Sequence, residues 1–178
     1  EAVWLIQAIF HALSALLIFF VSKLIFGGFW HPLAGFVASL FIAFSPDLIV
    51  ASSMLLTENF TILLLIISLA LLYRHSESAH YSYFPAAAIG FISGVSVLVR
   101  APSVVLAVPF LAVFYSKKRI AGAMIFIVAM SVVFIPWIIR NYKVYGELVP
   151  FSVNFGNNFL AGNHPKATGE LDDSRYEY

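Results

Sequence analysis

Cysteine is absent from this sequence of 178 residues, and charged residues are scarce. Without cysteine the chain can form no disulfide, thiol nucleophile or cysteine-ligated metal site. Charged residues make up 11% of the chain and hydrophobic residues 61%, whereas a typical soluble domain is about 25% charged and about 45–50% apolar. So few charges could not cover the surface of a soluble domain, but in a bilayer apolar side chains can face acyl tails. The composition therefore predicts an integral membrane protein that crosses the bilayer several times.

The apolar residues fall into stretches that are separated by glycine, proline and charged residues. A helix needs about 20 residues to cross the hydrocarbon core, and shorter stretches need tilt or local thinning. Strands are a poor alternative because lone strands in lipid would leave backbone groups unpaired. We therefore predict an all-α, polytopic bundle of about six transmembrane helices within residues 1–140. The stretches are 2–26, 33–50, 60–73, 84–99, 104–115 and 120–139.

The basic residues of the short loops predict the orientation of this bundle. The densest cluster, Lys117-Lys118-Arg119, is placed inside, because loops on the cytoplasmic side are enriched in lysine and arginine. Counting crossings then places the loops at 47–58 and 100–102 outside. The polar residues 141–178 also fall outside, as an irregular outer loop or the start of a soluble domain. Arg100 and Arg140 thus lie on the outer side against the trend, which invites a functional explanation.

Two carboxylates, Asp47 and Glu58, flank one short outer loop. Paired carboxylates can bind a divalent cation such as Mg or Mn, or serve as acid and base. The alternative is helix capping, with Asp47 or Thr57 as the cap and Glu58 in a first turn. Asn59 also begins an Asn-X-Thr sequon, which we discount because it lies at the start of a helix.

Two arginines are candidates for binding phosphate. The guanidinium of Arg100 or Arg140 could hold a phosphate with two hydrogen bonds, whereas the alternative is an arginine that extends to the membrane interface. Asn141 and Tyr142 follow Arg140 and could contact the same ligand. An ordinary belt of aromatic residues, with Trp137 and Tyr142, is the alternative there.

The outer segment is rich in asparagine and glycine. Amide side chains at Asn154, Asn157 and Asn158, followed by His164, could hydrogen-bond a sugar, although a plain turn-rich loop is the alternative. In the first stretch Gln7, His11 and Ser14 share one helix face, and for them we prefer packing against other helices to a metal site.

The order of these motifs resembles the GT-C glycosyltransferases of the glycosyltransferase family 39 type, which include protein O-mannosyltransferases and aminoarabinose transferases. The resemblance covers nearly the whole chain. Each motif is short, and the specificity lies in their order and spacing. The motifs are LLTEN at 55–59, Gly90 with Gly94, RAP at 100–102, PWIIRNY at 136–142, NFGNN at 154–158 and ATG at 167–169.

The resemblance implies a transferase that moves a sugar from a polyprenyl-phosphate donor to an acceptor at the outer face. It implies that Glu58 binds a divalent cation or the donor's phosphate region, and that Arg100 and Arg140 bind the phosphate. Asn141, Tyr142 and the Asn/Gly loop would bind substrate. The family's catalytic aspartate lies in an outer loop that is expected upstream of Glu1, so no catalytic base is assigned. The expected location is a bacterial plasma membrane, with lipid and the lipid-linked sugar as partners and no nucleic acid.

A second class of function stays open at this point. A transporter or lipid flippase would also carry ionisable residues in its membrane helices, lining a pathway. Against it, the charged residues lie at the ends of the stretches, and no inverted repeat is visible. A purely structural subunit is a third possibility, which predicts that Glu58, Arg100 and Arg140 can be replaced without loss of activity.

Overall fold

The computed structural model describes residues 2–53, 57–78, 82–149, 159 and 163. The chain divides into two compact units, Glu1–Pro136 and Trp137–Tyr178, and each is described by itself. In the described ranges the secondary structure is helical, without strands, as the sequence predicted. The elements are α1 (Ala2–Phe26), η1 (Gly28–Trp30), α2 (His31–Ala43), α3 (Pro46–Ser53), α4 (Glu58–Glu77), α5 (Tyr83–Val99), η2 (Ala101–Leu106), α6 (Ala107–Ser116) and α7 (Ile120–Tyr145).

Three of these helices, α1, α4 and α7, are long and apolar enough to cross a membrane. The predicted stretch at 33–50 is not one helix, because α2 and α3 meet at an angle of 46°. Pro46, the first residue of α3, has no N–H to donate and disfavours helical geometry in the residue before it. The bent pair could form a fourth span, while α5 and the η2–α6 segment are shorter apolar helices. Six crossings therefore stay a prediction.

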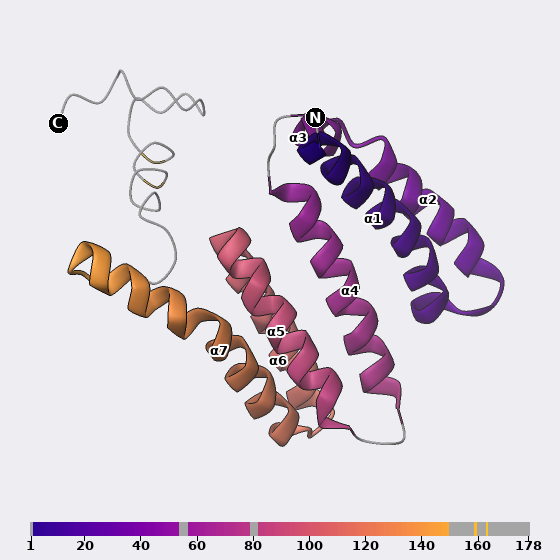
Figure 1. Cartoon of the computed structure of the whole chain (residues 1–178). Coiled ribbons are helices and arrows are strands. Elements are labelled where there is room, and N and C mark those ends of the chain that lie inside the picture. Colours follow the sequence, from indigo (N-terminus) through magenta and orange to yellow (C-terminus); the bar gives the residue numbers. More distant parts are fainter. Residues whose placement is uncertain (1, 54–56, 79–81, 150–158, 160–162, 164–178) are drawn as a thin grey trace. The chain divides into compact units, whose positions relative to one another are not determined.

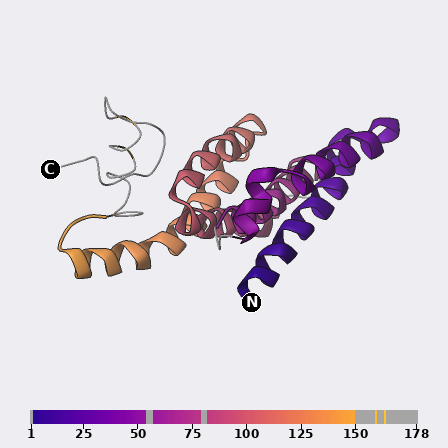
Figure 2. The same ribbon diagram turned by 90° about the horizontal axis from the view of Figure 1, so that it is seen from above.

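Within the first unit, α1 packs both against the helix that follows it and against a helix further along the chain. α1 packs along α2 and also along α4, and α4 packs against α5 (Figures 1 and 2). Aromatic side chains form part of the core: Phe110 and Phe114 of α6 lie beside Phe126 of α7 with ring centroids 6.1 Å apart in each pair. All three are almost fully buried. These rings form one part of the interior, and buried residues of the earlier helices, such as Val21 and Ile66, form another.

Glycine allows α5 and α7 to approach closely. A Cβ atom added to Gly90 would lie 2.3 Å from the carbonyl oxygen of Phe126, and one added to Gly94 would lie 2.8 Å from the Cβ of Val133. Small residues spaced four apart permit such close backbone contact between membrane helices. The Gly90–Gly94 motif therefore has a packing function.

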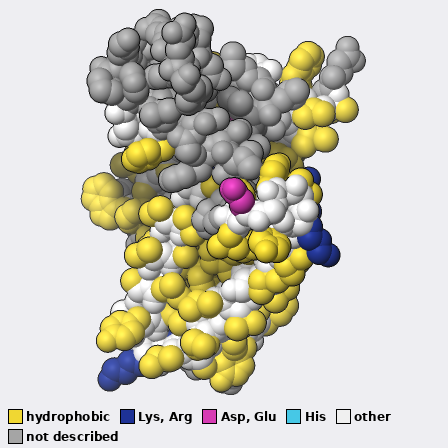
Figure 3. All heavy atoms as spheres, turned by 90° about the vertical axis from the view of Figure 1, so that its left-hand side faces the viewer, with side chains coloured by type: hydrophobic (Ala, Val, Ile, Leu, Met, Phe, Trp, Pro, Cys, Tyr) yellow, Lys and Arg dark blue, Asp and Glu magenta, His cyan; other side chains and the backbone are white. Residues whose placement is uncertain are grey.

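Much of the outer surface is hydrophobic. Only 17% of the most apolar windows of α1 and α7 are buried, and large side chains such as Trp4, Phe41 and Phe84 are exposed. Among the described side chains on the face drawn in Figure 3, hydrophobic ones dominate and few are charged. A soluble protein would not expose so large an apolar surface, whereas lipid tails would cover it.

Charged side chains of the first unit lie near the helix ends. Lys23 and Arg74 lie in the last turns of α1 and α4, and three basic residues, 117–119, lie at the connection between α6 and α7. These helix ends lie in the lower half of the view in Figure 1. We call this set the basic end: Lys23, Arg74, Lys117, Lys118 and Arg119.

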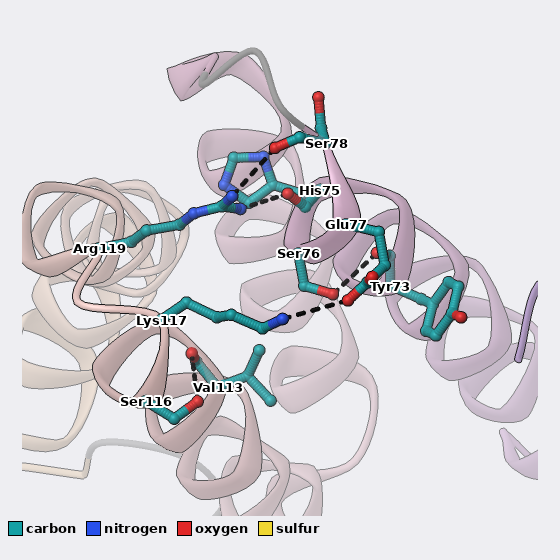
Figure 4. A network of polar contacts seen from close by, with 9 residues as sticks. All are labelled: Tyr73, His75, Ser76, Glu77, Ser78, Val113, Ser116, Lys117 and Arg119. Carbon is teal, nitrogen blue, oxygen red and sulfur yellow. Dashed lines mark hydrogen bonds and ion pairs between the residues drawn. The ribbon is translucent and has the colours of Figure 1, made fainter.

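Arg119 holds the C-terminal end of α4 (Figure 4). Its guanidinium donates to the backbone carbonyls of His75 and Ser78. Lys117 forms an ion pair with Glu77 at 3.1 Å, and both of these side chains are about half exposed. The basic cluster that the sequence analysis used for orientation therefore also caps a helix.

Candidate functional site

Glu58 and Arg100 form an ion pair at the opposite end of the same helices. Glu58 is the first residue of α4, and Arg100 directly follows the last residue of α5. Since α4 and α5 pack side by side in opposite directions, the start of one helix meets the end of the other (Figure 1). Nη1 of Arg100 lies 2.7 Å from Oε1 of Glu58. The structure thus joins two residues that the sequence analysis had treated as separate candidates.

The backbone around Arg100 fixes where its side chain begins. The residue is extended (φ −142°, ψ 108°), and its N–H donates to the carbonyl of Ser96 at 2.8 Å. Its own carbonyl accepts from the N–H of Ser103 at 2.9 Å, in the short helix that contains Pro102. Arg100 is therefore held between the end of α5 and the start of η2.

The ion pair is partly exposed. The side chain of Arg100 is 42% exposed and that of Glu58 is 27% exposed. A guanidinium has five N–H donors, so a single contact with Glu58 leaves donors for an anionic ligand. The second carboxylate oxygen of Glu58, Oε2, is buried and has no hydrogen-bond partner among the described residues. Glu58 therefore contacts Arg100 through Oε1 alone.

The next residue, Asn59, anchors the start of α4 to α3. Its side chain is 1% exposed, and its Nδ2 donates to Oγ of Ser52 at 2.7 Å and to the carbonyl of Leu48 at 3.2 Å. Because Asn59 is buried, the sequon that begins there is inaccessible in the folded chain. Ser52 could not be predicted as part of this contact, because serine occurs in many apolar stretches of this chain.

His11 extends this polar contact to two more helices. Its Nε2 hydrogen-bonds the carbonyl of Ile42 in α2 at 2.7 Å, and its Nδ1 lies 3.5 Å from Oγ of Ser52. Gln7 and Ser14, on the same face of α1, are buried. The predicted packing role of this stripe is confirmed. We call the contacts among Asn59, Ser52, His11 and Ile42 the polar chain.

The carboxylates of the predicted metal site, Asp47 and Glu58, lie in the first turns of two helices, and the metal stays a prediction. No group of three or more potential ligands among His, Cys, Asp and Glu lies together in the described ranges. Asp47 is exposed in the first turn of α3, and Glu58 opens α4, so both carboxylates occupy the turns where negative charge favours a helix. Thr57 occupies the cap position of α4 but makes no side-chain capping bond.

The second unit contains the other predicted arginine. The guanidinium carbon of Arg140 lies 5.0 Å from the ring centroid of Trp137, and Nη1 donates to Oδ1 of Asn141 at 3.0 Å. Asn141 is buried and donates through Nδ2 to the carbonyl of Val149 at 3.0 Å, while Tyr142 is exposed. Both ends of the Asn141 amide are therefore engaged within the chain. The predicted substrate contacts at Asn154, Asn157, Asn158 and His164 lie outside the described residues.

Long apolar helices with charged side chains near their ends, and an exposed hydrophobic surface, define an integral membrane protein. The family model described as dolichyl-phosphate-mannose-protein mannosyltransferase matches residues 1–139. The chain belongs to this family of membrane glycosyltransferases, which confirms the resemblance drawn from the sequence motifs. Neither the comparison with curated proteins nor that with solved structures gave a match.

Proposed function

We propose that this chain is part of a glycosyltransferase that takes a sugar from a polyprenyl-phosphate donor. The transfer would occur at the outer face of a bacterial plasma membrane. The observation that carries the proposal is the Glu58–Arg100 ion pair, which holds a half-exposed guanidinium at the helix ends opposite the basic end. Family membership supports the reaction class, and the acceptor is left open.

Arg100 would act on the leaving group. When the bond from the sugar to the phosphate breaks, negative charge grows on the phosphate oxygens, and a cation fixed beside them stabilises that charge. Arg100 keeps N–H groups free to hydrogen-bond the phosphate, while the carboxylate of Glu58 holds the guanidinium in place. Glu58 is therefore proposed as a positioning residue rather than as a group that touches the donor.

Arg140 is proposed as a second phosphate contact. Its described partners are the ring of Trp137 and the amide of Asn141, both uncharged, so no carboxylate in the described part of the second unit neutralises it. Asn141 would orient Arg140, whereas Tyr142 is exposed and could contact substrate. The proposal extends to Asn154, Asn157, Asn158 and His164 as contacts to the donor or acceptor sugar.

A divalent cation at Glu58 stays a prediction from the sequence. The described residues supply one free carboxylate oxygen there, Oε2 of Glu58, and no second acidic or histidine ligand beside it. We therefore derive no step through a metal. No described residue is assigned as the base that would take the acceptor's proton.

The transporter alternative receives less support. A transport pathway would require ionisable side chains at mid-depth. In the described parts of the three long helices, His11 is the one ionisable side chain far from a helix end, and it is bonded to the carbonyl of Ile42. A packing role accounts for it.

The test is sugar transfer by the complete protein in lipid, with polyprenyl-phosphate sugars as donors. In other enzymes, removing one hydrogen-bond donor that is fixed beside a developing negative oxygen lowers kcat by about 100-fold or more. We expect a loss of that order for Arg100→Gln. Arg140→Gln should also lose activity, and Lys118→Gln, which removes a charge at the basic end, should not. Undiminished transfer by both Arg100→Gln and Arg140→Gln would overturn the proposal.

A further inference from the structure

A groove lies between α1 and α4 near the basic end. It has a volume of 510 Å³, within the range of about 300–1,000 Å³ typical of small-molecule pockets. Apolar side chains from both helices form its walls, including Leu17 and Phe20 from α1 and Ile67 and Ala70 from α4. The groove is therefore suited to a hydrocarbon chain.

Two cations complete its lining. Lys23 and Arg74 both line the groove, and each lies in the last turn of its helix. This is possible because α1 and α4 run in the same direction: Phe10 and Phe60, near their beginnings, have ring centroids 5.0 Å apart. The hydrocarbon walls and the positive charges thus meet near the C-terminal ends of α1 and α4.

Neither cation is neutralised by the described part of the protein. Lys23 and Arg74 are exposed, and no ion pair or hydrogen bond joins either one to a described residue. Two other cations of the basic end already have partners within the protein, since Lys117 pairs with Glu77 and Arg119 caps α4. The groove therefore has two cations available for a negatively charged ligand.

We propose that this groove binds one anionic glycerophospholipid of the leaflet at the basic end. An acyl chain would lie along Leu17, Phe20, Ile67 and Ala70, and the phosphate would lie between Lys23 and Arg74. A single negative phosphate with an attached hydrocarbon chain matches both parts of the groove. The site is at the opposite end of α4 from Glu58, so the inference does not depend on the proposed reaction.

Native mass spectrometry of the full chain tests the headgroup preference. Phosphatidylglycerol and phosphatidylcholine with identical acyl chains are titrated separately. We expect tighter binding of phosphatidylglycerol, and we expect Lys23→Gln and Arg74→Gln each to weaken it by about fivefold, the effect of one basic residue near an anionic lipid. Lys118→Gln removes a charge from the same end but outside the groove, so it should bind like the unmodified protein. Equal binding of the two lipids, or an equal loss in Lys118→Gln, would overturn the proposal.

A second set of measurements separates a lipid site from a phosphate site. Inorganic phosphate at millimolar concentration should not displace phosphatidylglycerol, and displacement would contradict a lipid occupant. Ala70→Phe fills the groove and should weaken binding, whereas Ala88→Phe on α5 lies outside the groove and should not. Circular dichroism checks that the variants fold. Unchanged binding in a folded Ala70→Phe would overturn the proposal, and if that variant does not fold, the lysine and arginine variants decide.

Discussion

Gly90 lies directly against the backbone of Phe126, and a Cβ at Gly90 would be 2.3 Å from the carbonyl oxygen of Phe126. A backbone atom cannot move aside as the end of a flexible side chain can. Since Gly90 and Phe126 are both buried, the two helices must separate to admit even one carbon atom. This contact sets the distance between α5 and α7 at the point where Gly90 faces Phe126.

Gly90→Ala should therefore destabilise the protein. Overfilling a packed contact costs about 1–3 kcal/mol, and we expect a loss of stability in that range. The measurement is the thermal unfolding midpoint in detergent. Ala88→Val on the same helix adds more atoms but points into an open groove, and it should change stability little. Equal midpoints for Gly90→Ala and the unmodified protein would contradict the close approach.

Asn59→Leu should be destabilising although it makes the helix more apolar. The change removes the amide that donates to Ser52 and Leu48, and it forces a larger branched side chain into a site that is 1% exposed. Losing the hydrogen bonds to these partly buried acceptors should cost about 1–3 kcal/mol. Chemical denaturation in detergent gives the value. Thr61→Val, which removes only a local bond to the carbonyl of Thr57, is the matched control and should cost less.

Arg119→Gln should cost more stability than Lys117→Gln. Arg119 donates to two backbone carbonyls at the end of α4, whereas Lys117 makes one exposed ion pair. Exposed ion pairs contribute about 0–1 kcal/mol, and bonds from a charged donor contribute about 1.5–3 kcal/mol. Thermal unfolding of the two variants, measured side by side, checks the order. The reverse order would show that the cap contributes little.

Arg100→Lys should restore only part of the activity lost in Arg100→Gln. Lysine keeps the positive charge but lacks the planar set of donors that can contact Glu58 and a phosphate together. Glu58→Gln should lower kcat more than it raises the KM for the lipid-phosphate donor, because Glu58 positions Arg100, which stabilises charge that develops only in the transition state. Steady-state transfer kinetics with the complete protein separate the two constants. Full activity of Arg100→Lys would mean that charge alone matters.

The sequence predicted the helical class and most helix ends because proline, glycine and charged residues interrupt the apolar stretches. It failed at 33–50, where the bend between α2 and α3 divides one apolar stretch into two helices. Hydrophobicity does not reveal such a bend, since the residues on both sides are apolar. Pro46 was the available signal, and its position at the start of α3 explains the outcome.

Glu58 and Arg100 show the limit of the site prediction. Counting crossings placed both residues at one side of the membrane, but it could not say which helices are neighbours. The ion pair depends on the antiparallel packing of α4 and α5, and Asp47 takes no part in it although it was placed on the same side. Glu58, which the sequence predicts as a metal ligand, thus pairs with Arg100 among the described residues.

The polar chain also determines how variants far from the site would behave in a functional screen. His11 is in the first helix, yet it is connected through Ser52 to Asn59, the residue directly after Glu58. We expect a substitution at His11 to loosen the hold of Ser52 on Asn59, and with it the position of the carboxylate that pairs with Arg100. Such a variant would transfer sugar more slowly and would be mistaken for a change in the catalytic site, although the polar contacts of His11 among the described residues are with Ile42 and Ser52.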